Sequence, residues 1–379
     1  MVARQAGRTK RATLKDVAQA AGVSSTAVSL VLNDKPNRFT EETRAQIRKI
    51  AEDLNYVPNQ SARSLATRAS SLLALFIPDI ENLFFVSLAK HLEDECKKQG
   101  YSLLIVDTRE DLREQENALK RMIQLNIDGL FIVPVRGDKN GIKSEDKNKS
   151  SKESTGGDKA FMRSLAEADF PVVFVDRIPD DLTEEDMEDS WRALAYDHRA
   201  GGRLAAKLFA DRGHTKIGII GPVESKNSEF IGNIARFEGF VDELGLQKIS
   251  LDSNCIRNGD FNVSVGRDNA DALIDAGVTA VFCGNDLIAI GFTRRARERG
   301  KRVPQDISVI GYDDVMTAFG LDFDFTTIRQ DVHELAVRSC EAMLNGTHLQ
   351  KNNKATQISK ITMLQPQLVE RDTVAVAVK

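Results

Sequence analysis

The sequence lacks the residue patterns that mark most enzymes and metalloproteins. It contains no P-loop of the form GxxxxGK[ST], no HExxH pair and no GxSxG nucleophile turn. No GxGxxG follows the first strand that the sequence predicts, and the five histidines are scattered. Because catalysis needs a nucleophile with a base, a metal set or a phosphate-binding loop, we predict a protein that is not an enzyme and holds no metal or cofactor.

Cysteine pairs and long apolar runs are also missing. The four cysteines lie far apart without a CxxC spacing, which is typical of reduced thiols in a cytosolic core. No apolar run is long enough to cross a bilayer. The basic N-terminus is not followed by the apolar stretch of a signal peptide, so we expect a cytoplasmic, nucleoid-associated protein.

The overall net charge of −4 argues against a nucleic-acid-binding protein, but the charges are unevenly distributed. Residues 1–70 hold 12 basic and 6 acidic residues, whereas residues 71–379 hold 40 basic and 50 acidic residues. A basic N-terminal segment followed by an acidic remainder is expected when only one domain contacts the phosphates of a nucleic acid. A solvated basic tail would give the same totals, and residues 1–12 form such a basic arm.

Residues 13–33, TLKDVAQAAGVSSTAVSLVLN, predict two short helices. Apolar residues from Leu14 to Ala21 recur at i, i+3, i+4 and i+7, and Thr13 with Asp16 forms an acidic variant of a capping box. Gly22 ends the first helix. The pattern indicates either a helix-turn-helix, whose second helix fits the DNA major groove, or a helical hairpin that merely packs.

A third predicted helix and a polar linker follow. Thr40 can cap a helix that carries Ile47 and Leu54 on one face, and residues 56–70 read YVPNQSARSLATRAS. Together with residues 13–33, this stretch resembles the LacI family of bacterial transcription regulators. The resemblance implies a three-helix headpiece at residues 13–57, a short hinge helix and a sugar-sensing core, and it extends to about Glu370.

In such a headpiece the start of the second helix faces base edges. Ser25, Thr26 and Ser29 are short polar side chains suited to base or phosphate contacts. Leu30 stands where the family often has Arg; it cannot bond guanine bidentately but can touch a thymine methyl, so the operator sequence differs while the docking mode is kept. The headpiece residues that we predict to contact DNA are Thr13, Leu14, Ser24, Ser25, Thr26, Ser29, Leu30, Asn33, Thr43, Arg44 and Tyr56, with Asn33, Thr43, Arg44 and Tyr56 as backbone contacts.

The linker, residues 58–70, matches the hinge of the family. Asn59 can cap a helix through Ser61, Ala62 and Leu65 that is too short to be stable alone in water. Such a segment orders only when bound. Leu65 matches the family's wedge leucine, which kinks the duplex from the minor groove; the alternative is an ordinary linker residue. We therefore predict DNA contacts for Asn59, Ser61, Ala62 and Leu65.

From Leu72 onward, apolar runs such as LLALFI, VVFVD and ISVIGYDD alternate with amphipathic helical stretches. This alternation is typical of parallel sheets covered on both faces. We predict an all-α headpiece followed by an α/β core of two doubly wound parallel-sheet subdomains with a ligand cleft between them. The expected N-subdomain is residues 71–196 and 331–357, with a flexible polar insertion at 137–159; the C-subdomain is 197–328 and 358–373, and 374–379 is a tail.

Polar residues at strand ends indicate the ligand site, because the carboxyl ends of parallel strands face the cleft. Asp176-Arg177 ends one predicted strand, and Asn285-Asp286 and Asp313-Asp314 end two others. The family's effector pocket is lined at positions matching Phe84, Phe85, Asp176, Arg236, Phe261, Asn285, Asp313 and Gln330; Arg177 completes our candidate set. The alternatives are helix capping for Asp286 and Asp314, a core position for Phe84 and a surface ion pair for Arg236.

The sequence thus predicts a homodimeric repressor of carbohydrate-utilisation genes that binds a near-palindromic operator. A mono- or disaccharide in the cleft is expected to release the DNA. The alternatives are a purine corepressor, a global catabolite regulator with a phosphocarrier protein as corepressor, a sugar-binding protein that no longer reads DNA, and a cytosolic sugar enzyme.

Overall fold

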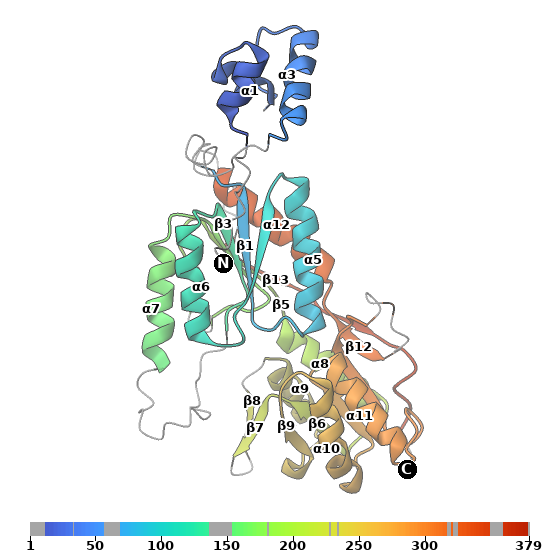
Figure 1. Ribbon diagram of the computed structural model, residues 1–379. Helices are drawn as coiled ribbons and strands as arrows, with labels where there is room; N and C mark the ends of the chain where they lie inside the picture. The colour runs from blue at the N-terminus through green and yellow to red at the C-terminus, as the bar shows by residue number, and fades with distance from the viewer. Residues whose placement is uncertain are drawn as a thin grey trace, which may run out of the picture. The chain divides into compact units, whose positions relative to one another are not determined.

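A computed structural model describes most of the chain, and the described residues fall into two compact units (Figure 1). The headpiece is residues 1–70 and the core is residues 71–379. The described residues are 12–32, 34–56, 69–135, 154–179, 182–226, 229–232, 235–316, 320, 325–348 and 359–377. No helix among them is long and apolar enough to span a membrane.

The headpiece consists of three helices, α1 (Leu14–Ala21), α2 (Ser25–Leu32) and α3 (Glu41–Asp53). The predicted helix ends are confirmed. Thr13 and Asp16 form a capping box at the start of α1, and Gly22 ends α1 in the left-handed conformation at φ 65°. Thr40 caps α3 by accepting from the Thr43 N–H. Val17, Ala18, Val28, Val31, Ile47 and Ala51 form the buried core of the headpiece.

The first lobe of the core is a parallel sheet in the order β13-β5-β4-β3-β1-β2. Its strands are β1 (Leu72–Ile77), β2 (Ser102–Asp107), β3 (Gly129–Ile132), β4 (Val172–Val175), β5 (Trp191–Tyr196) and β13 (Ile361–Leu364). Helices α5 (Leu83–Lys98) and α12 (Val332–His348) cover one face of the sheet, and α6 (Leu112–Gln124) and α7 (Ser154–Ala166) cover the other (Figure 1).

The second lobe has the sheet order β14-β12-β11-β10-β6-β9, in which β14 alone runs antiparallel to its neighbour. Its strands are β6 (Ile217–Gly221), β9 (Ile256–Asn258), β10 (Ala280–Cys283), β11 (Ser308–Asp313), β12 (Thr326–Arg329) and β14 (Gln367–Val369). Helices α8 (His198–Asp211) and α9 (Ala235–Leu246) pack on one face, and α10 (Val263–Asp275) and α11 (Asp286–Glu298) on the other. A hairpin of β7 (Val223–Lys226) and β8 (Glu229–Gly232) and a short 3-10 helix (Ser253–Cys255) complete the described elements.

Both helix pairs of the second lobe touch backbone to backbone at glycines. A Cβ on Gly202 of α8 would lie 1.8 Å from the Arg236 carbonyl oxygen of α9. A Cβ on Gly291 of α11 would lie 1.9 Å from the Val263 carbonyl oxygen of α10. Only glycine permits such an approach, so Gly202 sets the position of the first turn of α9.

The structure corrects three boundaries. Strand β13 pairs with β5, so residues 361–364 belong to the first lobe. The chain therefore passes into the second lobe for the last time after Leu364, and not at residue 358 as predicted. Residues 154–159, which were predicted to be flexible, form the start of α7. Buried Phe161 and Leu165 anchor this helix, and each further residue that joins an existing helix gains one backbone hydrogen bond. The predicted tail is docked as far as Ala377, whose N–H donates to the Arg212 carbonyl. Residues 137–153 lie outside the described residues.

The four cysteines are free and buried, as predicted. A single apolar cluster includes all four of them, and its members come from both lobes. The two lobes therefore share a continuous core.

Candidate nucleic-acid interface and effector site

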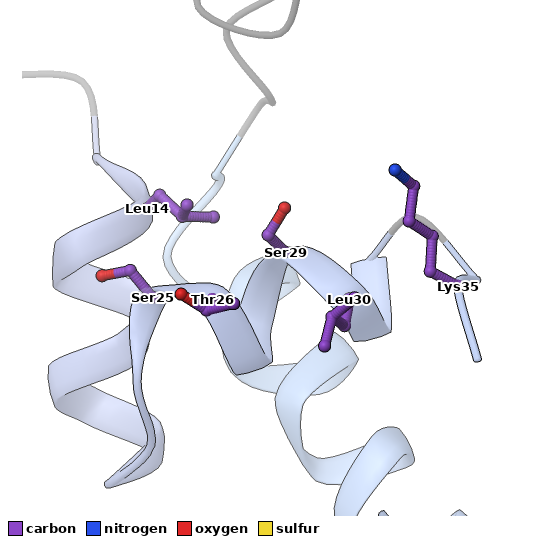
Figure 2. A pocket seen from close by; sticks show the side chains of 6 residues that line it. All are labelled: Leu14, Ser25, Thr26, Ser29, Leu30 and Lys35. Atoms are coloured by element: carbon purple, nitrogen blue, oxygen red, sulfur yellow. The ribbon is translucent and has the colours of Figure 1, made fainter. Parts of the chain in front are cut away.

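The headpiece surface is hollowed beside α2. Leu14, Ser25, Thr26, Ser29, Leu30 and Lys35 line a hollow of about 300 Å³ (Figure 2). Five of these six residues are among the predicted DNA contacts. Helix α2 carries no charged residue, so this surface offers hydroxyl groups and apolar carbon to a partner. Hydroxyls bond base edges or phosphates, and apolar carbon contacts thymine methyl groups.

Two other predicted DNA contacts are engaged in helix capping. The Thr13 hydroxyl donates to the Asp16 carboxylate at 2.8 Å, and the Ser24 hydroxyl accepts from the Ala27 N–H at 3.1 Å. These bonds fix the starts of α1 and α2, and thereby the orientation of α2.

The predicted backbone contacts have partners inside the headpiece. Arg44 pairs with Asp34 at 3.4 Å and with Glu41 at 3.6 Å. The hydroxyl of Thr43 lies 3.0 Å from that of Thr40. The ring of Tyr56 packs on the headpiece core, and burial raises the pKa of its phenol. The other predicted contacts, Asn33, Asn59, Ser61, Ala62 and Leu65, lie outside the described residues.

Lys35 is the residue of the hollow that the sequence analysis missed. It follows the end of α2, and its backbone N–H donates to the Leu30 carbonyl at 3.0 Å. The available signal was a lysine directly after the predicted second helix, two residues beyond Asn33.

In the core, Arg236 at the start of α9 lies at the centre of a buried polar cluster. Its Nη1 donates to the Gly284 carbonyl at 2.6 Å and lies 3.5 Å from Oδ1 of Asp313. Its guanidinium stacks 3.8 Å from the ring centre of Tyr312 and 5.3 Å from that of Phe261. Arg236 is therefore a buried cation held by a carboxylate and two aromatic rings, not a surface ion pair.

Asp313 ends β11 and faces both Arg236 and Gln330. The Gln330 amide donates to Asp313 Oδ1 at 2.7 Å. Burial raises the pKa of Asp313, although the charge of Arg236 and the Gln330 hydrogen bond oppose that rise. Asp313 takes up a left-handed backbone at φ 98°, an uncommon conformation that occurs at ligand sites.

Asp176 brings the first lobe into the same cluster through His198, which the sequence analysis missed. Nε2 of His198 lies 3.6 Å from Oδ1 and 3.4 Å from the carbonyl of Asp176, and Nδ1 lies 3.3 Å from the Tyr312 hydroxyl. Burial alone would raise the pKa of Asp176, but His198, Arg177 and Arg236 lower it below its ordinary value. Asp176 is thus an ionised carboxylate at the junction of the lobes.

Three buried atoms of this cluster have no hydrogen-bond partner among the residues that the structure describes. They are Oδ1 of Asp176, Nε of Arg236 and Oε1 of Gln330. A buried polar atom without a partner is costly, and such atoms are rare in folded proteins. We call Asp176, His198, Arg236, Tyr312, Asp313 and Gln330 the interlobe cluster.

The remaining candidates lie beside this cluster or within the core. Arg177 pairs with Glu110 at 2.7 Å and stacks 5.5 Å from the ring centre of Phe85. Phe84 is 3% exposed and packs in the apolar core, edge-on to Phe85. Arg177 and Phe85 therefore form a separate group in the first lobe.

Asn285 has a structural role that the prediction did not assign. Its Oδ1 caps α11 by accepting from the Ile288 N–H at 2.9 Å, and its Nδ2 donates to the Phe261 carbonyl at 3.3 Å. The expectation that Asp286 caps this helix is therefore wrong. Asp286 is buried and accepts from Thr327 and from the Val315 N–H, and burial followed by the charge of Asp313 raises its pKa to about 8.

Asp314 was also expected to cap a helix. Its carboxylate instead pairs with Arg329 at 2.7 Å and Arg371 at 2.8 Å. Asp314 joins β12 and the C-terminal segment to the end of β11. Among the residues that the structure describes, no group of three His, Cys, Asp or Glu side chains could hold a metal ion.

Comparison with known proteins matches both units. A family described as "Bacterial regulatory proteins, lacI family" matches residues 13–59, and a "Periplasmic binding protein-like domain" matches residues 206–374. The chain is 30% identical over 365 residues to the HTH-type transcriptional repressor PurR of Vibrio atlanticus (strain LGP32), covering 96% of this chain and 98% of that protein.

Solved structures share the fold. The lac repressor dimer bound to operator and the anti-inducer ONPF has a TM-score of 0.76 at 24% identity, covering 97% of this chain and 100% of that one. A LacI family regulator from Enterococcus faecium with bound ribose has a TM-score of 0.62 at 23% identity, covering 80% and 99%. The chain belongs to the LacI family and is a DNA-binding transcription regulator.

Proposed function

We propose that this regulator is a repressor that binds a near-palindromic operator as a homodimer and responds to a small effector in the interlobe cluster. Repression is supported by the similarity to PurR repressors over nearly the whole chain. Dimeric binding is supported by the fold shared with the operator-bound lac repressor dimer. Two copies of α2 on a two-fold axis would read two half-sites about one helical turn apart.

The observation that carries the effector proposal is the set of unpartnered atoms in the interlobe cluster. Oδ1 of Asp176 and Oε1 of Gln330 need hydrogen-bond donors, and Nε of Arg236 needs an acceptor. These atoms come from the ends of strands and helices in both lobes. A small polar molecule with donors on two sides and an acceptor between them would satisfy all three.

A mono- or disaccharide is our first candidate for this molecule. Sugar hydroxyls both donate and accept, so they can bond the carboxylate, the amide and the guanidinium. Phe261 lies against Arg236 and offers an aromatic face to the apolar side of a sugar ring. An ionised Asp176 favours a neutral ligand over a sugar phosphate.

A purine base is the second candidate, and the PurR relatives favour it. The ring N–H groups of a purine would meet Asp176 and Gln330, and its acceptor atoms would meet Arg236. The flat ring would stack on Phe261. This pocket chemistry is shared with a sugar, so the two candidates need a direct test.

The effector would act through the contact between Asp176 and His198. This contact joins the first lobe to the start of α8 in the second lobe. A ligand that bonds Asp176 and Arg236 together favours one lobe arrangement. By linkage, that preference changes operator affinity and effector affinity by the same factor.

A thermal-shift panel with the full-length protein tests the proposal. Ribose, cellobiose, adenine and guanine are added singly, and any compound that raises the melting temperature is then assayed for its effect on binding to an operator duplex. Asp313→Ala should abolish the shift, whereas the exposed Arg267→Ala should retain it. A shift that survives Asp313→Ala would show that the compound binds elsewhere.

A further inference from the structure

Helix α2, the predicted DNA-reading helix, carries no positive charge. Its sequence, STAVSLVL, contains neither Lys nor Arg, and Leu30 occupies a position at which the family often has Arg. Guanine is most often read by Arg or Lys, which donate to its O6 and N7 atoms. The α2 side chains alone therefore cannot make this contact.

Lys35 brings an ammonium group to the same hollow from outside the helix. Its backbone N–H is bonded to the Leu30 carbonyl at 3.0 Å, and its own carbonyl accepts from Asn37 Nδ2 at 2.8 Å. The backbone of Lys35 is thus held on both sides. Figure 2 shows the Lys35 amine directed toward the same side of the headpiece as the Ser29 hydroxyl.

The ammonium of Lys35 is available for a partner. Within the headpiece residues 12–32 and 34–56, no ion pair involves Lys35, whereas Arg44 and Arg48 are both paired with Asp34 and Glu41. The remaining residues that line the hollow are uncharged. Lys35 is therefore the only cation among the residues that line it.

We propose that Lys35 is a specificity-determining residue that donates to a guanine in each half-site, in place of the arginine that α2 lacks. This inference rests on the proposed docking of α2 in the major groove. A base contact is favoured over a phosphate contact because Lys35 shares its hollow with Leu14, Ser29 and Leu30, which suit base edges and thymine methyl groups. Leu30 would meet the neighbouring thymine.

Selection from a random double-stranded DNA library tests this proposal with full-length protein. The wild type should enrich a palindrome with a G·C pair at one position of each half-site. Lys35→Ala should lose about tenfold in affinity per half-site, or about a hundredfold for the palindromic duplex, and should select any base pair at that position, with the other positions unchanged. Lys35→Arg should retain the guanine preference.

The control is Lys49→Ala, which removes the same charge from an exposed position of α3 outside the hollow. It should leave the selected sequence unchanged. Uniformly weaker binding of Lys35→Ala to every duplex, with a salt-dependence slope smaller by about 2 (one per protomer), would indicate a phosphate contact and overturn the proposal. If the wild type enriches no sequence, the docking of α2 itself is wrong.

Because Lys35 is exposed, its removal should not change the melting temperature. A lower melting temperature of Lys35→Ala would assign the loss of affinity to unfolding, and it would also count against the proposal.

Discussion

The two candidate sites of this chain are built in opposite ways. The hollow beside α2 is lined by exposed or half-buried hydroxyl and apolar side chains, with one lysine. The interlobe cluster is buried and carries Asp176, Arg236 and Asp313 with less than a tenth of each side chain exposed. The first surface is open to solvent, whereas most of the second is buried.

Because of this difference in burial, the two sites depend to different extents on the packing of the fold. An exposed hydroxyl costs little when unbound, so the reading surface requires only that α1 and α2 be correctly capped. A buried charge must be paired, so the interlobe cluster depends on the packing of the whole second lobe. Substitutions in the cluster should therefore affect stability and response, whereas substitutions at the hollow should affect operator affinity alone.

The two largest expected effects are of similar size, and the first is that of Gly202→Ala. The added methyl group would meet the Arg236 carbonyl oxygen at 1.8 Å and force α8 and α9 apart, which displaces Arg236. We expect a loss of about 3 kcal/mol in the free energy of unfolding, measured by urea denaturation of the core. Gly245→Ala in the same α9 is the control, because its Cβ meets nothing within 4 Å. An equal loss in both variants would contradict the role of close helix packing.

Arg236→Ala tests the cluster without changing the backbone. Removing the guanidinium leaves Asp313 buried beside Gln330 without its cation, and breaking such a pair costs about 3 kcal/mol. Operator affinity without effector should remain near that of the wild type. Arg267→Ala removes an exposed pair with Glu298 and should cost less than about 1 kcal/mol. Similar costs for the two variants would show that Arg236 is not held as a buried charge.

The pH dependence of the free energy of unfolding should report the raised pKa of Asp286. Its pKa is raised to about 8 in the folded chain, from an ordinary value of 3.8, so the folded state holds one proton more than the unfolded state between these values. Stability should therefore fall as pH rises from 5 to 7.5, by up to about 1.4 kcal/mol per unit. Asp286→Asn should flatten this slope.

Asp306→Asn provides the control for that measurement. Arg302 lowers the pKa of Asp306 to about 2, so this carboxyl titrates below the pH window and its replacement should leave the slope unchanged. If Asp286→Asn retains the wild-type slope, another group causes the pH dependence.

The smallest expected effect is that of Thr13→Ala in the headpiece. It removes the hydroxyl that accepts from the Asp16 N–H and should lower headpiece stability by about 1 kcal/mol. Effector-induced thermal shifts of the core should be unaffected. Circular dichroism of the headpiece transition would measure the loss, and a matching change in the core transition would contradict the independence of the two sites.

Local features of the fold were predictable from the sequence. The Thr13–Asp16 capping box and the Thr40 cap depend on residues three positions apart, and the end of the first helix depends on Gly22 itself; all three are observed. The convergence of Asp176, Arg236 and Asp313 was expected from the family resemblance and the strand ends, and the structure brings them together. Their role with an effector stays a prediction.

Features that depend on distant segments were not predictable. His198 joins the cluster because β5 leads into α8 beside the end of β4, and no local pattern reports that pairing. The edge strand β13 is short and half exposed, so its pairing with β5 leaves no apolar signal. Asn285 rather than Asp286 caps α11, because one residue of helix register decides which side chain reaches the free N–H groups and which points into the core.

The last described segment, residues 359–377, has a consequence for synthesis. It supplies β13 to one sheet and β14 to the other, so neither lobe has its full set of strands until this segment leaves the ribosome. Domains usually fold one after another as the chain emerges, but here both lobes await the same final stretch. A premature stop before Ile361 would therefore leave two unfinished sheet edges in one polypeptide, each able to pair with a neighbouring chain and aggregate.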